Sequence, residues 1–240
     1  MSKGAIFNTD AHVEPVPLHD ANACYVVDDV LIEPERLRAW AIAQRDAFRP
    51  VDFNAYPGQY LMAPERYNEA LQSFYLSHIR THFDARRLLK MHCRLSMVTI
   101  PPAALRPYQW LCHSDNFAPD PRQSIQASVL YLFEDTALGG TSFYKPRRAV
   151  AEIARLFDDA TRMNADQFTR RYGIGPGYML GDNDFFARTG SIPARWNRMI
   201  FYDGSLLHSG DIVAPERLTS DPATGRLTFN GFFTARRNAR

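Results

Sequence analysis

Short strand-like segments, each bounded by turn residues, dominate this chain from Leu88 onward and constrain its fold more than any other feature. The segments rich in β-branched and aromatic residues are 88–100, 124–133, 140–146, 198–204 and 226–235. Few helical patterns separate them, and this arrangement is typical of an antiparallel sandwich or barrel. The sequence therefore predicts a mainly β protein with its core at 88–235.

The first third of the chain is predicted to be mixed. Residues 1–22 are polar and contain prolines, which indicates an N-terminal arm, and residues 23–32 resemble a strand. Apolar spacing predicts helices from Pro34 to about Phe48 and from Pro64 to about Phe83. We therefore expect residues 23–87 to form a helical support for the β core.

Residues 147–196 interrupt the series of strands with helical spacing, and we expect a helical insertion there. This segment carries several arginines: Arg147, Arg148, Arg155, Arg170 and Arg171. They form either a lid that meets a substrate carboxylate or the solvated basic face of an amphipathic helix. No linker divides the chain, so residues 1–240 are predicted to be a single domain.

Composition excludes several classes of protein. With 240 residues, of which 45% are hydrophobic, the chain can bury a substantial core. The formal net charge of +2 lacks the basic excess of a nucleic-acid-binding protein, and the 3 cysteines indicate no disulfide framework. No apolar run approaches the length of a membrane span, so we expect a cytoplasmic protein.

One group of residues suggests a metal site. His113 and Asp115 lie two residues apart, and alternate residues of an extended segment point to the same side. His208 follows the strand-like segment 198–204. Two imidazoles and one carboxylate on one face of an ion are typical of the facial triad of non-haem Fe(II) oxygenases. Because short H-x-D sequences also arise by chance, the order of the surrounding motifs carries more weight.

Five motifs occur in a definite order: His113-Ser114-Asp115, Tyr131-Leu132, Gly139-Gly140-Thr141-Ser142-Phe143, His208, and Arg226-Leu227-Thr228-Phe229-Asn230. Over about residues 90–235 this order resembles the 2-oxoglutarate- and Fe(II)-dependent oxygenases, in particular their prolyl-4-hydroxylase-like branch. The resemblance implies a double-stranded β-helix, or jelly-roll, core with N-terminal helices and a helical insertion.

The resemblance also implies roles for individual residues. His113, Asp115 and His208 would be the iron ligands and catalytic centre. Arg226 would pair with the distal carboxylate of 2-oxoglutarate, and the Tyr131 hydroxyl would help to hold the same group. Two further residues would line this pocket through strand alternation, Thr228 and Asn230. Arg217 stands closer to the family's usual spacing from His208, but the prolines and glycine around it indicate a loop, so Arg226 is preferred.

The function implied by the resemblance is that of a dioxygenase that uses Fe(II), 2-oxoglutarate and O2, with ascorbate in support. Such an enzyme hydroxylates an aliphatic C–H bond of a small amino-acid-like molecule or a protein side chain. Halogenases of the superfamily have a small residue where this chain has Asp115, which favours hydroxylation, whereas desaturation and ring closure use the same ligands. The alternative is a catalytically silent β-helix or cupin-like module that binds a metal or small molecule.

Other residues have simpler interpretations. His78 and His82 lack the glutamate of an H-E-x-x-H motif and are expected to face solvent or a partner side chain. His92 is expected to be a packed core residue. The segment 56–59 is either a substrate loop or a plain turn.

Overall fold

The computed structural model describes residues 4–51, 54–115 and 120–238. The first three residues of the predicted N-terminal arm lie outside this described part. Eleven strands are present within it: β1 (Val13–Pro17), β2 (Ala23–Val27), β3 (Arg49–Pro50), β4 (Gly58–Met62), β5 (Arg87–Val98), β6 (Gln123–Tyr131), β7 (Thr141–Pro146), β8 (Phe186–Ile192), β9 (Met199–Asp203), β10 (Leu207–Gly210) and β11 (Arg226–Arg236).

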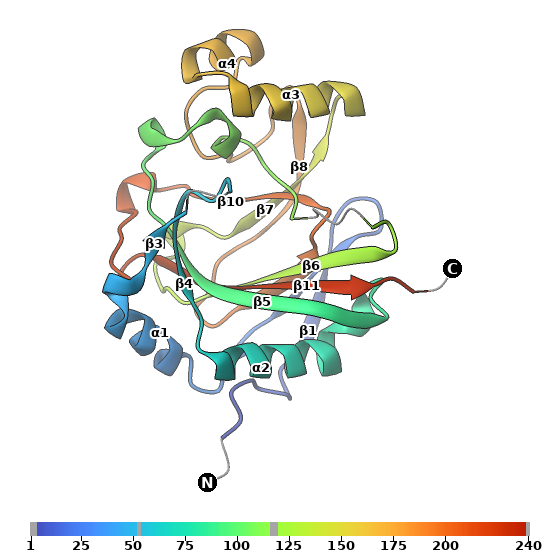
Figure 1. Ribbon diagram of the computed structural model, residues 1–240, viewed down its shortest axis with the longest axis vertical. Helices are drawn as coiled ribbons and strands as arrows, with labels where there is room; N and C mark the ends of the chain where they lie inside the picture. Colours follow the sequence, from blue (N-terminus) through green and yellow to red (C-terminus); the bar gives the residue numbers. More distant parts are fainter. Residues whose placement is uncertain (1–3, 52–53, 116–119, 239–240) are drawn as a thin grey trace.

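The strands form two antiparallel sheets (Figure 1). The larger sheet has eight strands in the order β1-β2-β9-β6-β11-β5-β4-β3, and the smaller has three in the order β10-β7-β8. Their order does not follow the order of the chain, because β11 pairs with β5 on one side and β6 on the other. The predicted mainly β, double-stranded β-helix fold is confirmed by this architecture.

Two helices, α1 (Pro34–Ala43) and α2 (Glu65–Phe74), support the larger sheet. Their buried faces belong to one hydrophobic cluster with residues of β5, β9 and β11, and Figure 1 shows them beneath that sheet. Both predicted helices extended further than the α-helices do. The first ends in a 3-10 turn at Arg45–Ala47, and the second continues as a π turn at Tyr75–Ile79 and a 3-10 turn at Arg80–His82.

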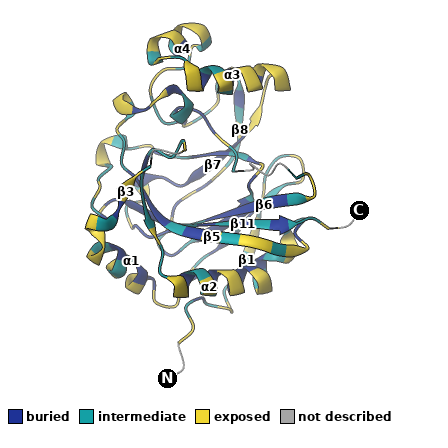
Figure 2. Cartoon of the chain, viewed as in Figure 1, coloured by how far each residue is buried: buried dark blue, intermediate teal, exposed yellow. Residues whose placement is uncertain are grey.

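The insertion contains α3 (Val150–Arg162) and α4 (Ala165–Tyr172), which lie at the end of the molecule opposite α2 (Figures 1 and 2). The expectation of a helical insertion over 147–196 was wrong in its last part, because Phe186–Ile192 forms β8 and pairs with β7. A glycine at position 190 and the polar residues around it obscure the strand pattern there. The helical insertion therefore ends before Phe186.

The insertion packs on the segment that leads to His113. Its buried side chains form a third hydrophobic cluster with residues 105–112, in which Phe168 meets the Trp110 ring edge to face at 5.9 Å between centroids. This contact buries the apolar faces of α3 and α4 and leaves their charged faces exposed (Figure 2).

The predicted N-terminal arm also contains a strand. Val13–Pro17 pairs with β2 as β1, the edge strand of the larger sheet. Pro15 and Pro17 fit this position, because an edge strand tolerates residues without a backbone donor. None of the described helices is long and apolar enough to cross a lipid bilayer.

Candidate functional site

Backbone hydrogen bonds bring the three predicted metal ligands together. His113 forms an isolated antiparallel bridge with His208 on β10: the His113 N–H donates to the His208 carbonyl at 2.9 Å, and the reverse bond is 2.8 Å long. The Asp115 N–H donates to the carbonyl of Gly204 at 2.7 Å. The segment 113–115 is therefore held against the β9–β10 hairpin at both of its ends.

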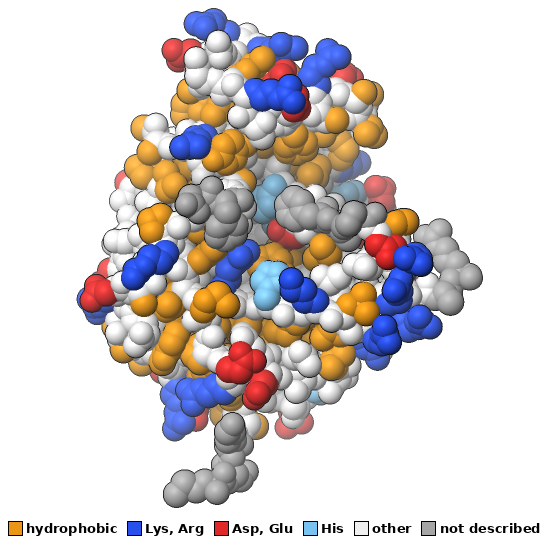
Figure 3. All heavy atoms as spheres, viewed as in Figure 1, with side chains coloured by type: hydrophobic (Ala, Val, Ile, Leu, Met, Phe, Trp, Pro, Cys, Tyr) orange, Lys and Arg blue, Asp and Glu red, His pale blue; other side chains and the backbone are white. Residues whose placement is uncertain are grey.

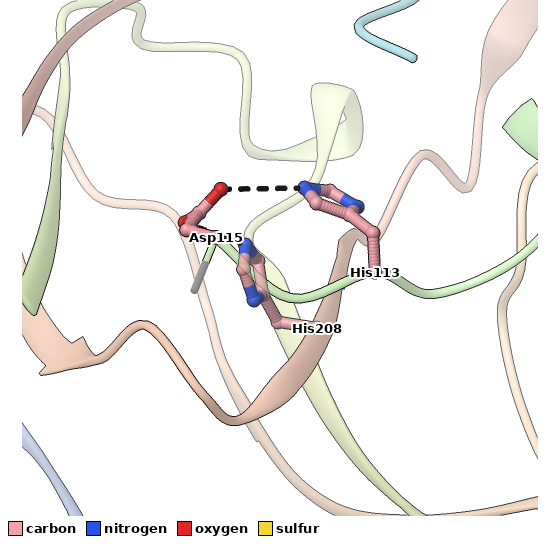
Figure 4. Close-up of side chains that lie close together, drawn as sticks. All are labelled: His113, Asp115 and His208. Atoms are coloured by element: carbon pink, nitrogen blue, oxygen red, sulfur yellow. Dashed lines mark ion pairs between the residues drawn. The ribbon is translucent and has the colours of Figure 1, made fainter. Parts of the chain in front are cut away.

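The three side chains converge (Figure 4). Nε2 of His208 lies 3.3 Å from Oδ2 of Asp115, and Nε2 of His113 lies 3.9 Å from Oδ1 of the same carboxylate. One ligand atom from each of the three residues lies within 4.8 Å of the others. This spacing matches a donor set that can surround a single ion, as predicted from the alternation of His113 and Asp115.

Hydrogen bonds also orient His208. Its Nδ1 lies 2.9 Å from the carbonyl oxygen of Leu206, which fixes Nδ1 as the protonated nitrogen of the neutral ring and leaves Nε2 as the acceptor. The buried hydroxyl of Tyr202 lies 3.1 Å from this Nε2 and 3.5 Å from Oδ2 of Asp115. Tyr202 is a site residue that the sequence reasoning missed. Its place on the strand six residues before His208 was the available signal.

The charges of the three groups are coupled. The pKa of His113 is lowered to about 4. The main cause is that neighbouring protein atoms exclude water from the ring, and the second cause is the nearby His208. Burial alone would raise the pKa of Asp115, but the two histidines outweigh it and the pKa is lowered. Burial would lower the pKa of His208, whereas Asp115 raises it more. At neutral pH the site therefore holds an ionised carboxylate and a neutral His113, both ready to bind a cation.

A cavity of 380 Å³ opens beside the three residues, and Figure 3 shows histidine side chains at the edge of a hollow on this face. The cavity has the size of a small-molecule site. Its lining residues come mainly from the inner face of the larger sheet and from β10. The lining residues include Tyr56, Tyr60, His92, Arg94, His113, Asp115, Thr141, Tyr202, His208, Arg226, Thr228, Asn230 and Phe232.

Arg226 lies in the wall of this cavity and is only 4% exposed. Its Nε donates to the carbonyl of Leu138 at 2.9 Å and to that of Gly139 at 3.2 Å, and Nη2 donates to Gly140 at 2.8 Å. Residues 138–140 form a turn, called here the glycine turn, whose backbone requires glycine at positions 139 and 140. Gly139 has a φ of +79°, and a Cβ at Gly140 would stand 1.9 Å from the carbonyl oxygen of Ile192.

No carboxylate within the described residues forms an ion pair with Arg226, whereas Arg217 pairs with Asp135 at 3.0 Å on the surface. A buried guanidinium whose hydrogen bonds go to neutral carbonyls favours an anion beside it. Thr228 and Asn230 line the same cavity, as strand alternation predicted, and Arg217 does not.

Tyr131 does not itself line the cavity, and its predicted role at the distal carboxylate stays a prediction. Tyr131 is fully buried behind the cavity wall, and its hydroxyl lies 2.8 Å from Oγ1 of Thr141, which itself lines the cavity. Tyr56, in contrast, lines the cavity itself. Its hydroxyl is buried near Arg226 and Thr228 and forms no short hydrogen bond with any of the described residues, and burial raises its pKa, so it stays a neutral donor.

Two further lining residues were not predicted. His92 is exposed at the cavity and stacks on Phe232 at 5.0 Å, so the expectation of a packed core residue was wrong. Arg94 lies two residues further along β5, on the same face of the strand. The alternation of His92, Arg94 and Ser96 was the signal for a polar inner face. Segment 56–59 contributes through Tyr56, while residues 52–53 before it lie outside the described residues.

Several solved structures are similar to this chain. The non-haem α-ketoglutarate-dependent carbocyclase SnoK from nogalamycin biosynthesis is 13% identical, with a TM-score of 0.50 over 89% of this chain and 80% of that one. A prolyl-4-hydroxylase from Pseudomonas putida is 17% identical, with a TM-score of 0.48 over 91% and 94%. HygX from Streptomyces hygroscopicus, solved with nickel and 2-oxoglutarate, is 10% identical, with a TM-score of 0.48 over 91% and 84%.

No curated protein matches the sequence. Residues 9–233 match the protein family described as a family of unknown function, DUF6445. At the identity of SnoK, the structural likeness establishes the fold and leaves the reaction to be argued from the site. The chain is therefore a member of the DUF6445 family and has the jelly-roll fold of the 2-oxoglutarate- and Fe(II)-dependent oxygenases.

Proposed function

We propose that this protein is a Fe(II)- and 2-oxoglutarate-dependent dioxygenase that hydroxylates an aliphatic C–H bond. The proposal rests on one observation: the same cavity is lined by the His113, Asp115 and His208 triad and by Arg226. Arg226 is buried and forms no ion pair with a carboxylate of the described residues. The triad suits a divalent cation, and the arginine suits an organic anion. A cavity without a ligand would gain nothing from both a metal-binding triad and a buried arginine, because buried charged groups cost free energy.

The donor set fits Fe(II). Two imidazole nitrogens and one carboxylate oxygen on one side of an ion leave open positions on the other side, which is the arrangement of non-haem iron oxygenases. Nε2 of His208, Nε2 of His113 and one oxygen of Asp115 would be the ligands. When bound, the iron would supply the activation of O2 that the protein side chains cannot provide.

The other wall residues would position 2-oxoglutarate. Arg226 would pair with its distal carboxylate, and its contacts with the glycine turn already hold the guanidinium in place. The buried Tyr56 hydroxyl would donate to the same carboxylate, and Thr228 and Asn230 would line its path. Tyr131 would act on this group through Thr141.

The reaction consumes one O2 and one 2-oxoglutarate for each substrate. One oxygen atom enters the substrate as a hydroxyl, and the other enters succinate as 2-oxoglutarate loses CO2. The retained Asp115 favours hydroxylation over halogenation, and ascorbate would support turnover. The cavity volume of 380 Å³ suits a small amino-acid-like molecule or a single protein side chain. We propose that the enzyme works in the cytoplasm.

Succinate release tests the proposal. Purified protein with Fe(II), 2-oxoglutarate and ascorbate would be screened against amino acids, peptides and cell extract, and products would be analysed by mass spectrometry. We expect O2-dependent succinate release coupled to the gain of one oxygen atom. Loss of two hydrogens instead would indicate desaturation or ring closure. A catalytically silent binding module would release no more succinate than the His208→Ala variant.

A further inference from the structure

Arg94 is a second cation in the same cavity, at a distance from Arg226. The cross-strand partner of Arg94 is Asn230, which lies four residues along β11 from Arg226. Four residues of an antiparallel strand extend over about 13 Å. Arg94 therefore belongs to a different part of the cavity, and we expect its role to be separate from that of Arg226.

Arg94 lies near the metal triad, two residues along the sheet from the row of residues that contains Tyr202. Tyr202, which contacts His208 and Asp115, pairs with Ala127, and Ala127 pairs with Phe232 on β11. The Arg94 guanidinium carbon lies 4.8 Å from the centre of the Phe232 ring. Its charge also helps to lower the pKa of Asp115. Arg94 on the larger sheet and His208 on the smaller one therefore line the same part of the cavity.

Two aromatic rings hold the guanidinium of Arg94. Its carbon lies 3.9 Å from the centre of the Tyr60 ring, in addition to its contact with Phe232. Cation–π contacts use the flat faces of a guanidinium and leave its N–H edge for hydrogen bonds. Nε of Arg94 is buried and has no hydrogen-bond partner among the residues that the structure describes.

Arg94 forms no ion pair within residues 4–51, 54–115 and 120–238, although its charge interacts with that of Asp115. Asp115 forms its close pairs with the two histidines instead. The nearby His92 has its pKa lowered by burial and then by Arg94 and Lys90, so the ring stays neutral and neither neutralises Arg94 nor adds a positive charge beside it. A flat, fixed guanidinium fork with an unpaired donor is suited to a planar carboxylate.

We propose that Arg94 binds a carboxylate of the primary substrate, so that the enzyme acts on carboxylate-bearing molecules. This proposal rests on the proposed oxygenase function. With its carboxylate at Arg94, the substrate spans the cavity toward the triad, and the C–H bond to be oxidised lies at its other end. Arg94 thus selects substrates by charge, whereas Arg226 holds the cosubstrate.

Benzoate and benzamide test this assignment, because they share shape and size and differ in charge. Both would be titrated anaerobically by calorimetry into protein loaded with Fe(II) and saturated with 2-oxoglutarate, which occupies the Arg226 end. We expect benzoate to bind at least about 10-fold more tightly than benzamide, as for a charged hydrogen-bonded pair. The preference should vanish in Arg94→Gln, weaken in Arg94→Lys and persist in the surface control Arg217→Gln.

Several outcomes would overturn the proposal. They are equal binding of the two probes, absence of benzoate binding, a preference that survives in a folded Arg94→Gln, and a preference that depends on Arg226 instead. Thermal unfolding verifies folding, and Arg94→Lys provides the comparison if Arg94→Gln does not fold. The visible absorption band of the Fe(II) and 2-oxoglutarate complex is recorded first. A band without benzoate preference rejects only the role of Arg94, whereas absence of the band rejects the oxygenase function itself.

Discussion

The cavity wall and the helical insertion differ in whether their polar side chains have hydrogen-bond or ion-pair partners. Among the described residues of the cavity wall, the Tyr56 hydroxyl and Nε of Arg94 are buried without hydrogen-bond partners, and the hydrogen bonds of Arg226 go to neutral carbonyls. In the insertion, Asn164 and Gln167 cap α4 reciprocally, and Asp159 pairs with Arg171. Unsatisfied buried polar groups cost free energy, so they persist where a ligand completes them. Among the described residues, four of the eight unpartnered buried side-chain atoms belong to residues that line the cavity, and none belongs to α3 or α4. This contrast favours the wall as the functional region and the insertion as a structural one.

The insertion arginines follow this division. The predicted alternative of a lid finds no support, because none of these side chains lines the cavity: Arg147, Arg148, Arg155, Arg170 and Arg171. Arg147 pairs with Asp182, and Arg171 pairs with Asp159. The insertion instead fills the third hydrophobic cluster behind the segment that leads to His113.

Truncation of the insertion core should have the largest effect, and it should act on stability. Phe168 is fully buried against Trp110, so Phe168→Ala should lower the free energy of unfolding by about 4 kcal/mol. Urea unfolding would measure this loss. Phe168→Leu is the matched control and should cost less. If the insertion is a mobile lid instead, Phe168→Ala will leave stability unchanged and alter turnover.

Truncation of the buried arginine should act on ligand affinity. Arg226→Ala should weaken 2-oxoglutarate binding by about 3 kcal/mol, roughly 100-fold, because it removes the charge that faces the distal carboxylate. Anaerobic titration calorimetry would measure the affinity. Arg217→Ala should leave it unchanged, since Arg217 pairs with Asp135 at the surface. The reverse order would move the anchor to Arg217.

Removal of single hydroxyls should distinguish the role of Tyr56 in ligand binding from the role of Tyr131 in stability. Tyr56→Phe should weaken 2-oxoglutarate binding about 5-fold, the value of one hydrogen bond of about 1 kcal/mol, with little change in stability. Tyr131→Phe should instead lower stability by about 1 kcal/mol, because it breaks the bond to Thr141. Calorimetry and urea unfolding of both variants would test this. A larger affinity loss in Tyr131→Phe would restore the role first predicted for Tyr131.

The surface charges of the insertion should matter least. Arg171 is half exposed in its pair with Asp159, and exposed ion pairs contribute little. Arg171→Ala should change the free energy of unfolding by about 0.5 kcal/mol or less and leave succinate release unchanged. A loss of activity comparable to that of Arg226→Ala would contradict the division between the two regions.

Local patterns in the sequence predicted the parts of the molecule that local geometry controls. Alternation along an extended segment placed His113 beside Asp115, and it placed Thr228 and Asn230 in the cavity with Arg226. The order of motifs predicted that His208 approaches from a distant strand, and the backbone bridge between His113 and His208 achieves this.

Contacts between distant elements were beyond such patterns. Tyr131 does not line the cavity itself, and its hydroxyl contacts Thr141 from the smaller sheet. Tyr56 lines the cavity from a distant segment, which the turn pattern of residues 56–59 left open. His92 is exposed because the inner face of β5 lines a polar cavity and is not packed. Strand β8 was missed because its pairing with β7 stabilises a segment of weak strand pattern.

The central claim is that one cavity binds Fe(II) through the triad and 2-oxoglutarate through Arg226. Anaerobic absorption spectroscopy tests it most directly, since the joint complex gives a visible metal-to-ligand charge-transfer band. We predict that the band appears only when Fe(II) and 2-oxoglutarate are both present, that it is lost in His208→Ala, and that it requires far more 2-oxoglutarate in Arg226→Ala. A colourless wild-type protein at saturating concentrations of both, or an unchanged band in His208→Ala, would contradict the assignment.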